Sequence, residues 1–261
     1  MKNNFDSSKG KIVYWHDNKG SSKTILLIHG FMEDHEVWSD LAKELSSNVI
    51  MLDLLGFGES EPAGNFQFTM QEHTEAIHEL LEFLNIENLY VLGHSMGGYV
   101  ALELSLLIPD FNLGLLHSTC VADTDERKAN RNKTIQVLEK DPPLFIREFY
   151  WNLFAEHRQN EFGDIIEILK QKAQKVPVEY IIKTVRGLRD RKDHTHTWKL
   201  SGGNNVLIGG TYDKLINVEE IKELAFLGGA TWVELTNSGH MGFYEEAEHL
   251  PAIIDNWIDP K

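Results

Sequence analysis

Short apolar runs alternate with longer segments in which apolar residues recur at helical spacing. From Thr24 onward these runs are continuously apolar and do not alternate with polar residues, which is typical of buried strands in a parallel sheet. The predicted strands are Ile12–Trp15, Thr24–Ile28, Asn48–Leu52, Leu89–Leu92, Leu113–His117, Asn205–Ile208 and Thr231–Leu235. A single edge strand, Ile12–Trp15, is expected before Thr24.

Helical patterns separate most of these strands. Thr69 and Glu72 form a capping-box start for the helix predicted at Thr69–Leu84, because a threonine followed three residues later by a glutamate can satisfy free backbone donors. The predicted helices are Asp34–Leu45, Thr69–Leu84, Ser95–Ile108, Val218–Phe226 and Glu245–Trp257. Strand–helix alternation of this kind predicts an α/β fold with a mostly parallel, doubly wound sheet.

One segment interrupts the alternation. Residues 123–200 contain no good strand candidate and are charged, helical in pattern and rich in aromatic residues. We therefore predict a helical cap at 123–200, inserted between two strands of a core formed by residues 1–122 and 201–261. The aromatic residues can pack the interior of this insertion, and a lid must also present apolar surface to whatever lies beneath it.

Bulk properties exclude several classes of protein. The chain has 261 residues and a net charge of -15, which disfavours nucleic acid and anionic membranes as partners, since both require clustered lysine and arginine. Its one cysteine, Cys120, precludes an intramolecular disulfide and fits a reducing compartment. The segment Met1–Lys11 lacks an apolar signal core, so cytoplasmic residence is expected.

The most informative motif is Gly93-His94-Ser95-Met96-Gly97. It directly follows an apolar strand and precedes a helical run, which is the context that gives a G-x-S-x-G match its meaning. A serine held in such a sharp turn requires neighbours of little bulk, and Gly93 and Gly97 satisfy this requirement. Ser95 is therefore the candidate nucleophile.

A serine hydroxyl requires a base, and the base requires an orienting acid. His240 follows the last predicted strand and is the candidate base, while Asp213 follows the preceding strand and is the candidate acid. The order Ser95, Asp213, His240 is the one expected with a nucleophile elbow. Asp123 follows the strand Leu113–His117 and stays open as an alternative acid. The backbone N–H groups of Phe31 and Met96 are the candidate oxyanion donors.

Together these segments resemble the α/β-hydrolase superfamily, and most closely its small capped serine esterases and C–C-bond hydrolases. The resemblance covers about Thr24 to Trp257 and rests on the motifs His29–Phe31, Asp53–Ser60, Gly93–Gly98, Gly209–Asp213 and Ser238–His240. It implies a helical cap after the sixth strand, a Ser-His-Asp triad, a small-molecule substrate and no cofactor. No sequence feature defines an oligomeric state.

The sequence says less about the substrate than about the type of reaction. Phe31, Met96, Phe149 and Phe243 predict an apolar or aryl pocket, which favours small carboxylic esters cleaved through an acyl-enzyme. Two alternatives stay open: a C–C hydrolase or lyase acting on a diketone-type acid, and a receptor-like protein with little turnover. The first would need a cationic side chain over a substrate carboxylate, for which Arg186 or Arg189 could serve.

Two further groups of histidines lie outside this constellation. His94 adjoins the nucleophile and is expected to point into packing or solvent. His194 and His196 resemble a metal pair, but two residues at that spacing share a side only in a strand and no third ligand is evident. No metal site is therefore predicted.

Overall fold

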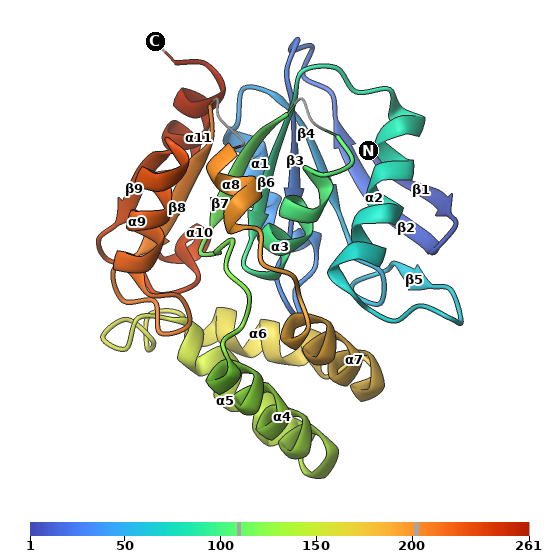
Figure 1. The fold of residues 1–261 in the computed structure, drawn as a ribbon, viewed down its shortest axis with the longest axis vertical. Helices are drawn as coiled ribbons and strands as arrows, with labels where there is room; N and C mark the ends of the chain where they lie inside the picture. Colours follow the sequence, from blue (N-terminus) through green and yellow to red (C-terminus); the bar gives the residue numbers. More distant parts are fainter. Residues whose placement is uncertain (109–110, 201–203, 261) are drawn as a thin grey trace.

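The computed structural model describes residues 1–108, 111–200 and 204–260. An open sheet runs through the molecule in the order β1-β2-β4-β3-β6-β7-β8-β9 (Figure 1). Its parallel part comprises β4 (Asn48–Leu52), β3 (Thr24–Ile28), β6 (Leu89–His94), β7 (Asn112–Leu116), β8 (Val206–Gly210) and β9 (Thr231–Leu235). The predicted mostly parallel α/β sheet is confirmed.

The N-terminal edge differs from the prediction. Two strands precede β3: β1 (Lys2–Ser7) pairs antiparallel with β2 (Gly10–Asp17), which also pairs antiparallel with β4 and with the short β5 (Glu61–Pro62). The expectation of a single edge strand was therefore wrong. Lys2–Ser7 alternates between exposed and half-buried positions and so has no apolar run. Its one aromatic residue, Phe5, contacts the ring of Phe83 on α2.

Helices cover both faces of the sheet. Helices α2 (Met70–Leu84) and α3 (Met96–Leu104) lie on one face, and α1 (Ser39–Glu44) and α11 (Leu250–Ile258) lie on the other (Figure 1). The Thr69 side chain caps α2 by accepting the Glu72 N–H at 3.2 Å, as the capping motif predicts. A turn of 3-10 helix precedes α1, and α10 (Gly242–Glu245) precedes α11.

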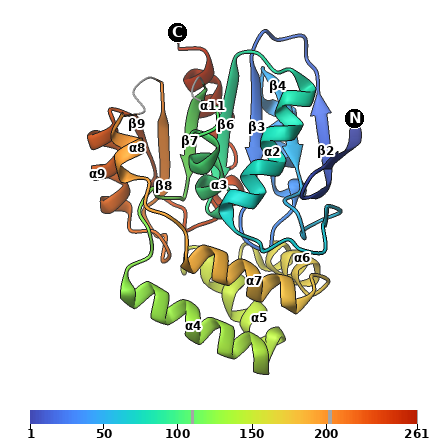
Figure 2. The same ribbon diagram turned by 45° about the vertical axis from the view of Figure 1, so that its right-hand side comes forward.

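Four helices lie together below the carboxyl ends of the parallel strands (Figure 2). They are α4 (Asp125–Lys140), α5 (Pro142–Leu153), α6 (Gly163–Ala173) and α7 (Val178–Arg189). The next helix, α8 (Thr195–Leu200), packs instead beside α9 (Val218–Gly228), where the Trp198 Nε1 donates to the Leu224 carbonyl at 2.8 Å. The division of the chain at residues 123 and 200 stays a prediction.

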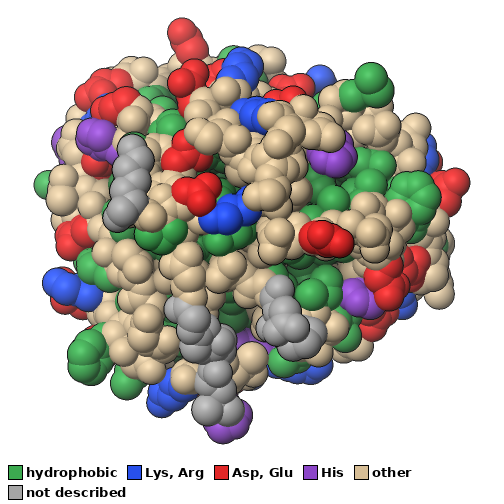
Figure 3. All heavy atoms as spheres, turned by 90° about the horizontal axis from the view of Figure 1, so that it is seen from above, with side chains coloured by type: hydrophobic (Ala, Val, Ile, Leu, Met, Phe, Trp, Pro, Cys, Tyr) green, Lys and Arg blue, Asp and Glu red, His purple; other side chains and the backbone are tan. Residues whose placement is uncertain are grey.

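The end of the molecule opposite α4–α7 carries mixed charge. On the face drawn in Figure 3, acidic and basic side chains are interspersed among the described residues, and no broad basic area is visible. Within the described part of the chain, no helix combines the length and the hydropathy needed to cross a membrane.

Candidate active site

Ser95 lies at the tip of a sharp turn between β6 and α3. Its backbone has φ 49° and ψ -114°, a strained conformation that a residue other than glycine adopts only when the surrounding structure enforces it. The Ser95 N–H donates to the Leu116 carbonyl at 2.9 Å, which fixes the turn to β7. A Cβ on Gly93 would lie 2.4 Å from the Gly97 carbonyl carbon, and one on Gly97 would lie 2.3 Å from the Ile28 carbonyl oxygen. The glycines of the motif are therefore required by this turn.

His240 and Asp213 form a buried pair. His240 lies in the loop between β9 and α10, and its Nδ1 is 2.7 Å from the Asp213 Oδ2. Asp213 follows β8, and its Oδ1 accepts the N–H groups of Leu215 at 2.8 Å and Ile216 at 3.0 Å. Oδ2 of Asp213 thus faces His240, while Oδ1 holds the following backbone. Because a carboxylate only accepts hydrogen bonds, Nδ1 of His240 carries the proton that faces Asp213.

Burial and charge act in opposite directions on this pair. Burial lowers the pKa of His240, but the charge of Asp213 and its hydrogen bond outweigh burial and leave that pKa raised. Burial raises the pKa of Asp213, yet the two neighbouring imidazoles, His240 and His117, hold that pKa far below its usual range. The structure therefore favours an ionised Asp213 beside a histidine that gains a proton readily.

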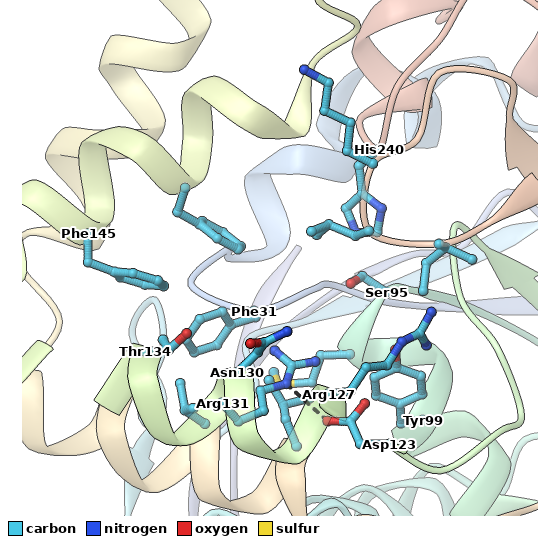
Figure 4. Close-up of a pocket in the computed structure, with 17 residues that line it drawn as sticks. Phe31, Ser95, Tyr99, Asp123, Arg127, Asn130, Arg131, Thr134, Phe145 and His240 are labelled. Carbon is cyan, nitrogen blue, oxygen red and sulfur yellow. Dashed lines mark hydrogen bonds and ion pairs between the residues drawn. The ribbon is translucent and has the colours of Figure 1, made fainter. Parts of the chain in front are cut away.

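Ser95 and His240 line the same cavity, and Figure 4 shows the two side chains at the same end of it. Among the described residues, the Ser95 hydroxyl makes no hydrogen bond with His240. The separation between a nucleophile and its base is often long without substrate and shortens in the Michaelis complex. The arrangement thus places the candidate nucleophile and the candidate base on one cavity.

The two candidate oxyanion donors belong to adjacent loops. Met96 is the first residue of α3, so its N–H has no partner within the helix. The Phe31 N–H, in the loop after β3, makes no hydrogen bond with any described residue. Both residues line the cavity that contains Ser95. Two free backbone donors beside a nucleophile are what a developing oxyanion requires.

His94 connects three loops of the site. Its Nδ1 lies 3.0 Å from the Glu33 Oε2, and its Nε2 lies 2.9 Å from the His240 carbonyl oxygen. The same Glu33 oxygen accepts the Gly30 N–H at 2.7 Å. Burial raises the pKa of Glu33, but the contacts with His94, together with His29 and the Gly30 N–H, outweigh burial and leave that pKa lowered. His94 thus occupies a buried polar network. The sequence predicted that His94 points into packing or solvent; it is buried, and both of its ring nitrogens make hydrogen bonds.

A second histidine shares the acid. The His117 Nδ1 is 3.2 Å from the Asp213 Oδ2, and its Nε2 accepts the Gly242 N–H at 3.3 Å. Because Nε2 accepts, the proton of the neutral ring lies on Nδ1 and points to Asp213. Burial lowers the pKa of His117 to about 4. Sequence reasoning placed His117 at the end of a strand and missed this contact.

His117, Asp213 and His240 have ligand atoms within 4.8 Å of one another, a spacing that a metal ion could also use. In this structure the Nδ1 protons of both rings face the carboxylate, so we interpret the group as a proton-positioning cluster. His194 and His196 do not converge: His194 is buried 3.1 Å from a Glu103 oxygen, whereas His196 is exposed at the start of α8.

The cavity beside Ser95 has a volume of about 260 Å³, at the small end for ligand pockets. Phe31, Met96 and Phe149 line it, and their contact with a substrate stays a prediction. Phe243 does not line it, and this part of the prediction was wrong. Its ring is buried against Trp38, His94 and Tyr244, with Trp38 at the end of the 3-10 turn that precedes α1.

Asp123 lies at the cavity but not beside the base. Its Oδ1 accepts from the Arg191 guanidinium at 2.6 Å and its Oδ2 from the Arg131 Nε at 3.1 Å. Asp213 is thus the carboxylate next to His240. Arg189 is bound to Asp190 and Asn132, and Arg186 lines a separate cleft between α2 and α7. The arginines near Ser95 are Arg127 and Arg131 of α4, which sequence reasoning did not single out.

Comparisons of the sequence and of the structure with known proteins find relatives of the same kind. The sequence model of the alpha/beta hydrolase fold matches residues 23–111. An uncharacterized hydrolase, YugF, of Bacillus subtilis is 30% identical over 95% of this chain and 94% of its own length. A thermophilic esterase from Thermogutta terrifontis superposes with a TM-score of 0.87 at 25% identity, over 99% of this chain and 98% of that one. The esterase EaEST from Exiguobacterium antarcticum, at 20% identity, shares the fold with a TM-score of 0.88 over 99% of both chains.

Proposed function

This chain belongs to the α/β-hydrolase fold family, and we propose that it is a serine hydrolase that cleaves small carboxylic esters. The observation that carries the proposal is the 2.7 Å contact between His240 and Asp213 at a cavity that also contains Ser95 in its strained turn. The esterase activity named for the structural relatives supports the same class of substrate.

In the proposed reaction, the Ser95 hydroxyl attacks the ester carbonyl while His240 takes its proton. Asp213 holds the imidazole tautomer and stabilises the imidazolium that forms. The N–H groups of Phe31 and Met96 bind the oxyanion, for which each donor is worth roughly 2.7–4 kcal/mol of transition-state stabilisation. His240 returns the proton to the departing alkoxide, the acyl-enzyme forms, and His240 then activates a water that releases the acid.

The cavity walls support a small substrate with an apolar part. Phe31, Phe145 and Phe149 form one side, where Phe149 contacts Phe31 edge-on with ring centroids 5.6 Å apart. The C–C hydrolase alternative needs a cationic side chain over a substrate carboxylate. Neither Arg186 nor Arg189 lines this cavity, but Arg127 and Arg131 of α4 do, so this alternative stays open. A cytoplasmic location stays a prediction, which the single buried thiol of Cys120 favours.

The test compares wild type with Ser95→Ala on 4-nitrophenyl butyrate and labels both with a fluorophosphonate. We expect turnover and stoichiometric labelling in wild type and neither in the variant. Ser105→Ala is the matched control, since Ser105 lies at the far end of α3, its hydroxyl donates to the Leu102 carbonyl at 2.7 Å, and it does not line the cavity. Wild-type rates equal to those of Ser95→Ala would refute the proposal. Tight ligand binding without turnover would then favour a receptor-like protein.

A further inference from the structure

Helix α4 turns an unusual face toward the candidate nucleophile. The residues of α4 that line the Ser95 cavity recur at the spacing i, i+3, i+4 and i+7, and they are Arg127, Asn130, Arg131 and Thr134. Arg127, Arg131 and Thr134 are half-buried and Asn130 is exposed, whereas the buried residues of α4 are Ile135 and Leu138. In Figure 4 these side chains lie along one side of the cavity, with Phe145 at one end and Ser95 and His240 at the other. The polar stripe therefore faces the substrate space.

The charges around this stripe do not cancel. Asp123 is neutralised by Arg191, which is buried, donates to the carbonyls of Leu188 and Val121 at 2.9 Å, and stacks over the Tyr99 ring at 4.2 Å. Arg131 also contacts Asp123, but only through Nε. Its two terminal nitrogens make no hydrogen bond with any described residue. One positive charge thus remains uncompensated in the cavity of a chain whose net charge is -15.

The other cations at the cavity have partners of their own at its rim. Arg127 lies 3.7 Å from a Glu220 oxygen, and Lys214 lies 3.0 Å from a Glu156 oxygen. Arg131 is only partly exposed, with 30% of its side-chain surface accessible, so an anion that reached it would be largely removed from water. Under such conditions a guanidinium binds a carboxylate with two parallel, charge-assisted hydrogen bonds.

We propose that Arg131, assisted by Asn130 and Thr134, binds a carboxylate carried by the substrate while Ser95 attacks an ester carbonyl of the same molecule. The inference rests on the proposed function and narrows it to small esters that bear a negative charge away from the scissile bond. The apolar wall formed by Phe31, Phe145 and Phe149 accommodates the carbon chain between the two groups.

The experiment uses two esters of equal shape: mono-4-nitrophenyl adipate, whose distal carboxylate is charged, and its neutral primary amide. We expect wild type to prefer the carboxylate. Arg131→Gln should lower kcat/KM for the carboxylate ester by roughly 10- to 100-fold and change that for the amide less than threefold. Arg131→Lys should recover part of the preference. Arg147→Gln is the matched control, because Arg147 is an exposed arginine of α5 paired with Glu148 outside the cavity.

An equal loss on both esters in Arg131→Gln would overturn the subsite and leave Arg131 a structural residue. Failure of wild type to hydrolyse either ester would instead refute the proposed function. In that event, calorimetric titration with adipate decides the subsite alone: weaker binding to Arg131→Gln than to wild type and Arg147→Gln supports it, and equal binding overturns it.

Discussion

The imidazole of His94 hydrogen-bonds to the main-chain carbonyl of His240 over 2.9 Å. The residue beside the candidate nucleophile therefore holds the loop that carries the candidate base. Through its other nitrogen, the same ring contacts Glu33, which accepts the N–H of Gly30 in the oxyanion loop. Three segments far apart in the sequence are thus tied by one buried polar network, in which each member depends on the others.

Glu33→Gln should lower kcat by up to roughly 100-fold, because it removes the negative charge that faces His94 and loosens the loop that presents the Phe31 N–H. Steady-state kinetics on 4-nitrophenyl butyrate measures this effect. Glu36→Gln is the control, since Glu36 lies three residues further on, in the 3-10 turn before α1, where it is exposed and paired with Lys172 at 2.6 Å. Equal rates for wild type and Glu33→Gln would show that the network does not position the site.

The pH dependence of kcat/KM should follow His240. A general base acts in its neutral form, and the pKa of His240 is raised by Asp213, so activity should fall with decreasing pH from a midpoint above the ordinary histidine value of about 6.5. Asp213→Asn should lower that midpoint and reduce the rate by roughly 10³–10⁴-fold. Asp123→Asn should leave the midpoint unchanged. If Asp123→Asn moves it and Asp213→Asn does not, Asp123 is the acid.

His117 should act as a positioning residue for Asp213. In His117→Leu, Asp213 loses one hydrogen-bond donor and the Gly242 N–H loses its acceptor, so kcat/KM should fall by roughly tenfold or more. Glutamine offers a donor and an acceptor, so His117→Gln should recover part of the loss. The pH profiles of both variants are the diagnostic measurement. A purely structural role would reduce the amount of folded protein without moving the midpoint of either profile.

His73 should make the free energy of unfolding decrease as the pH falls. Both of its ring nitrogens are buried without a hydrogen-bond partner among the described residues, and burial lowers its pKa to about 3. The unfolded chain takes up a proton below pH 6.5 whereas the folded state does not, so stability falls as pH drops from about 6.5 toward 3. His73→Leu should raise the free energy of unfolding by about 1–3 kcal/mol at neutral pH and reduce the acid loss.

Urea denaturation at several pH values measures the effect of His73→Leu. His78→Leu is the matched control, because His78 lies on the same helix but is partly exposed, 3.7 Å from a Glu82 oxygen. A lower stability of His73→Leu at neutral pH, or an unchanged acid dependence, would contradict the argument.

The sheet was predictable because continuous apolar runs such as Thr24–Ile28 occupy fully buried strands. The edge strand Lys2–Ser7 was not, since its pairing with β2 comes from backbone hydrogen bonds that leave no hydrophobic signature. The helix predicted at Glu245–Trp257 is instead α10 followed by α11, which begins at Leu250 with Pro251 in its first turn. Pro251 is the sequence signal for this start, because proline is favoured in the first turn of a helix and interrupts one that is already under way.

At the site, motif and chain order identified the residues that the structure brings together, Asp213 and His240. Contacts between distant loops could not be foreseen. The role of His94 depends on Glu33, which lies 61 residues away in the chain, and His117 reaches Asp213 over 96 residues. The polar residues of α4 recur at helical spacing in the sequence. A charged stripe of this kind normally predicts a solvent-exposed face, and only the tertiary structure shows that it lines the Ser95 cavity.

The chain enters and leaves the α4–α7 helices through one point. Asp123 on the outgoing segment is paired with Arg191 on the returning one, and the His194 N–H donates to the Cys120 carbonyl at 2.8 Å. Because these contacts fix both ends of the segment, the entropy of closing it is set at the junction and depends only weakly on its length. Changes in the length of the α4–α7 segment should therefore cost little closure entropy and leave the strands in register, provided that they spare Leu153, whose carbonyl accepts the His240 N–H at 2.7 Å.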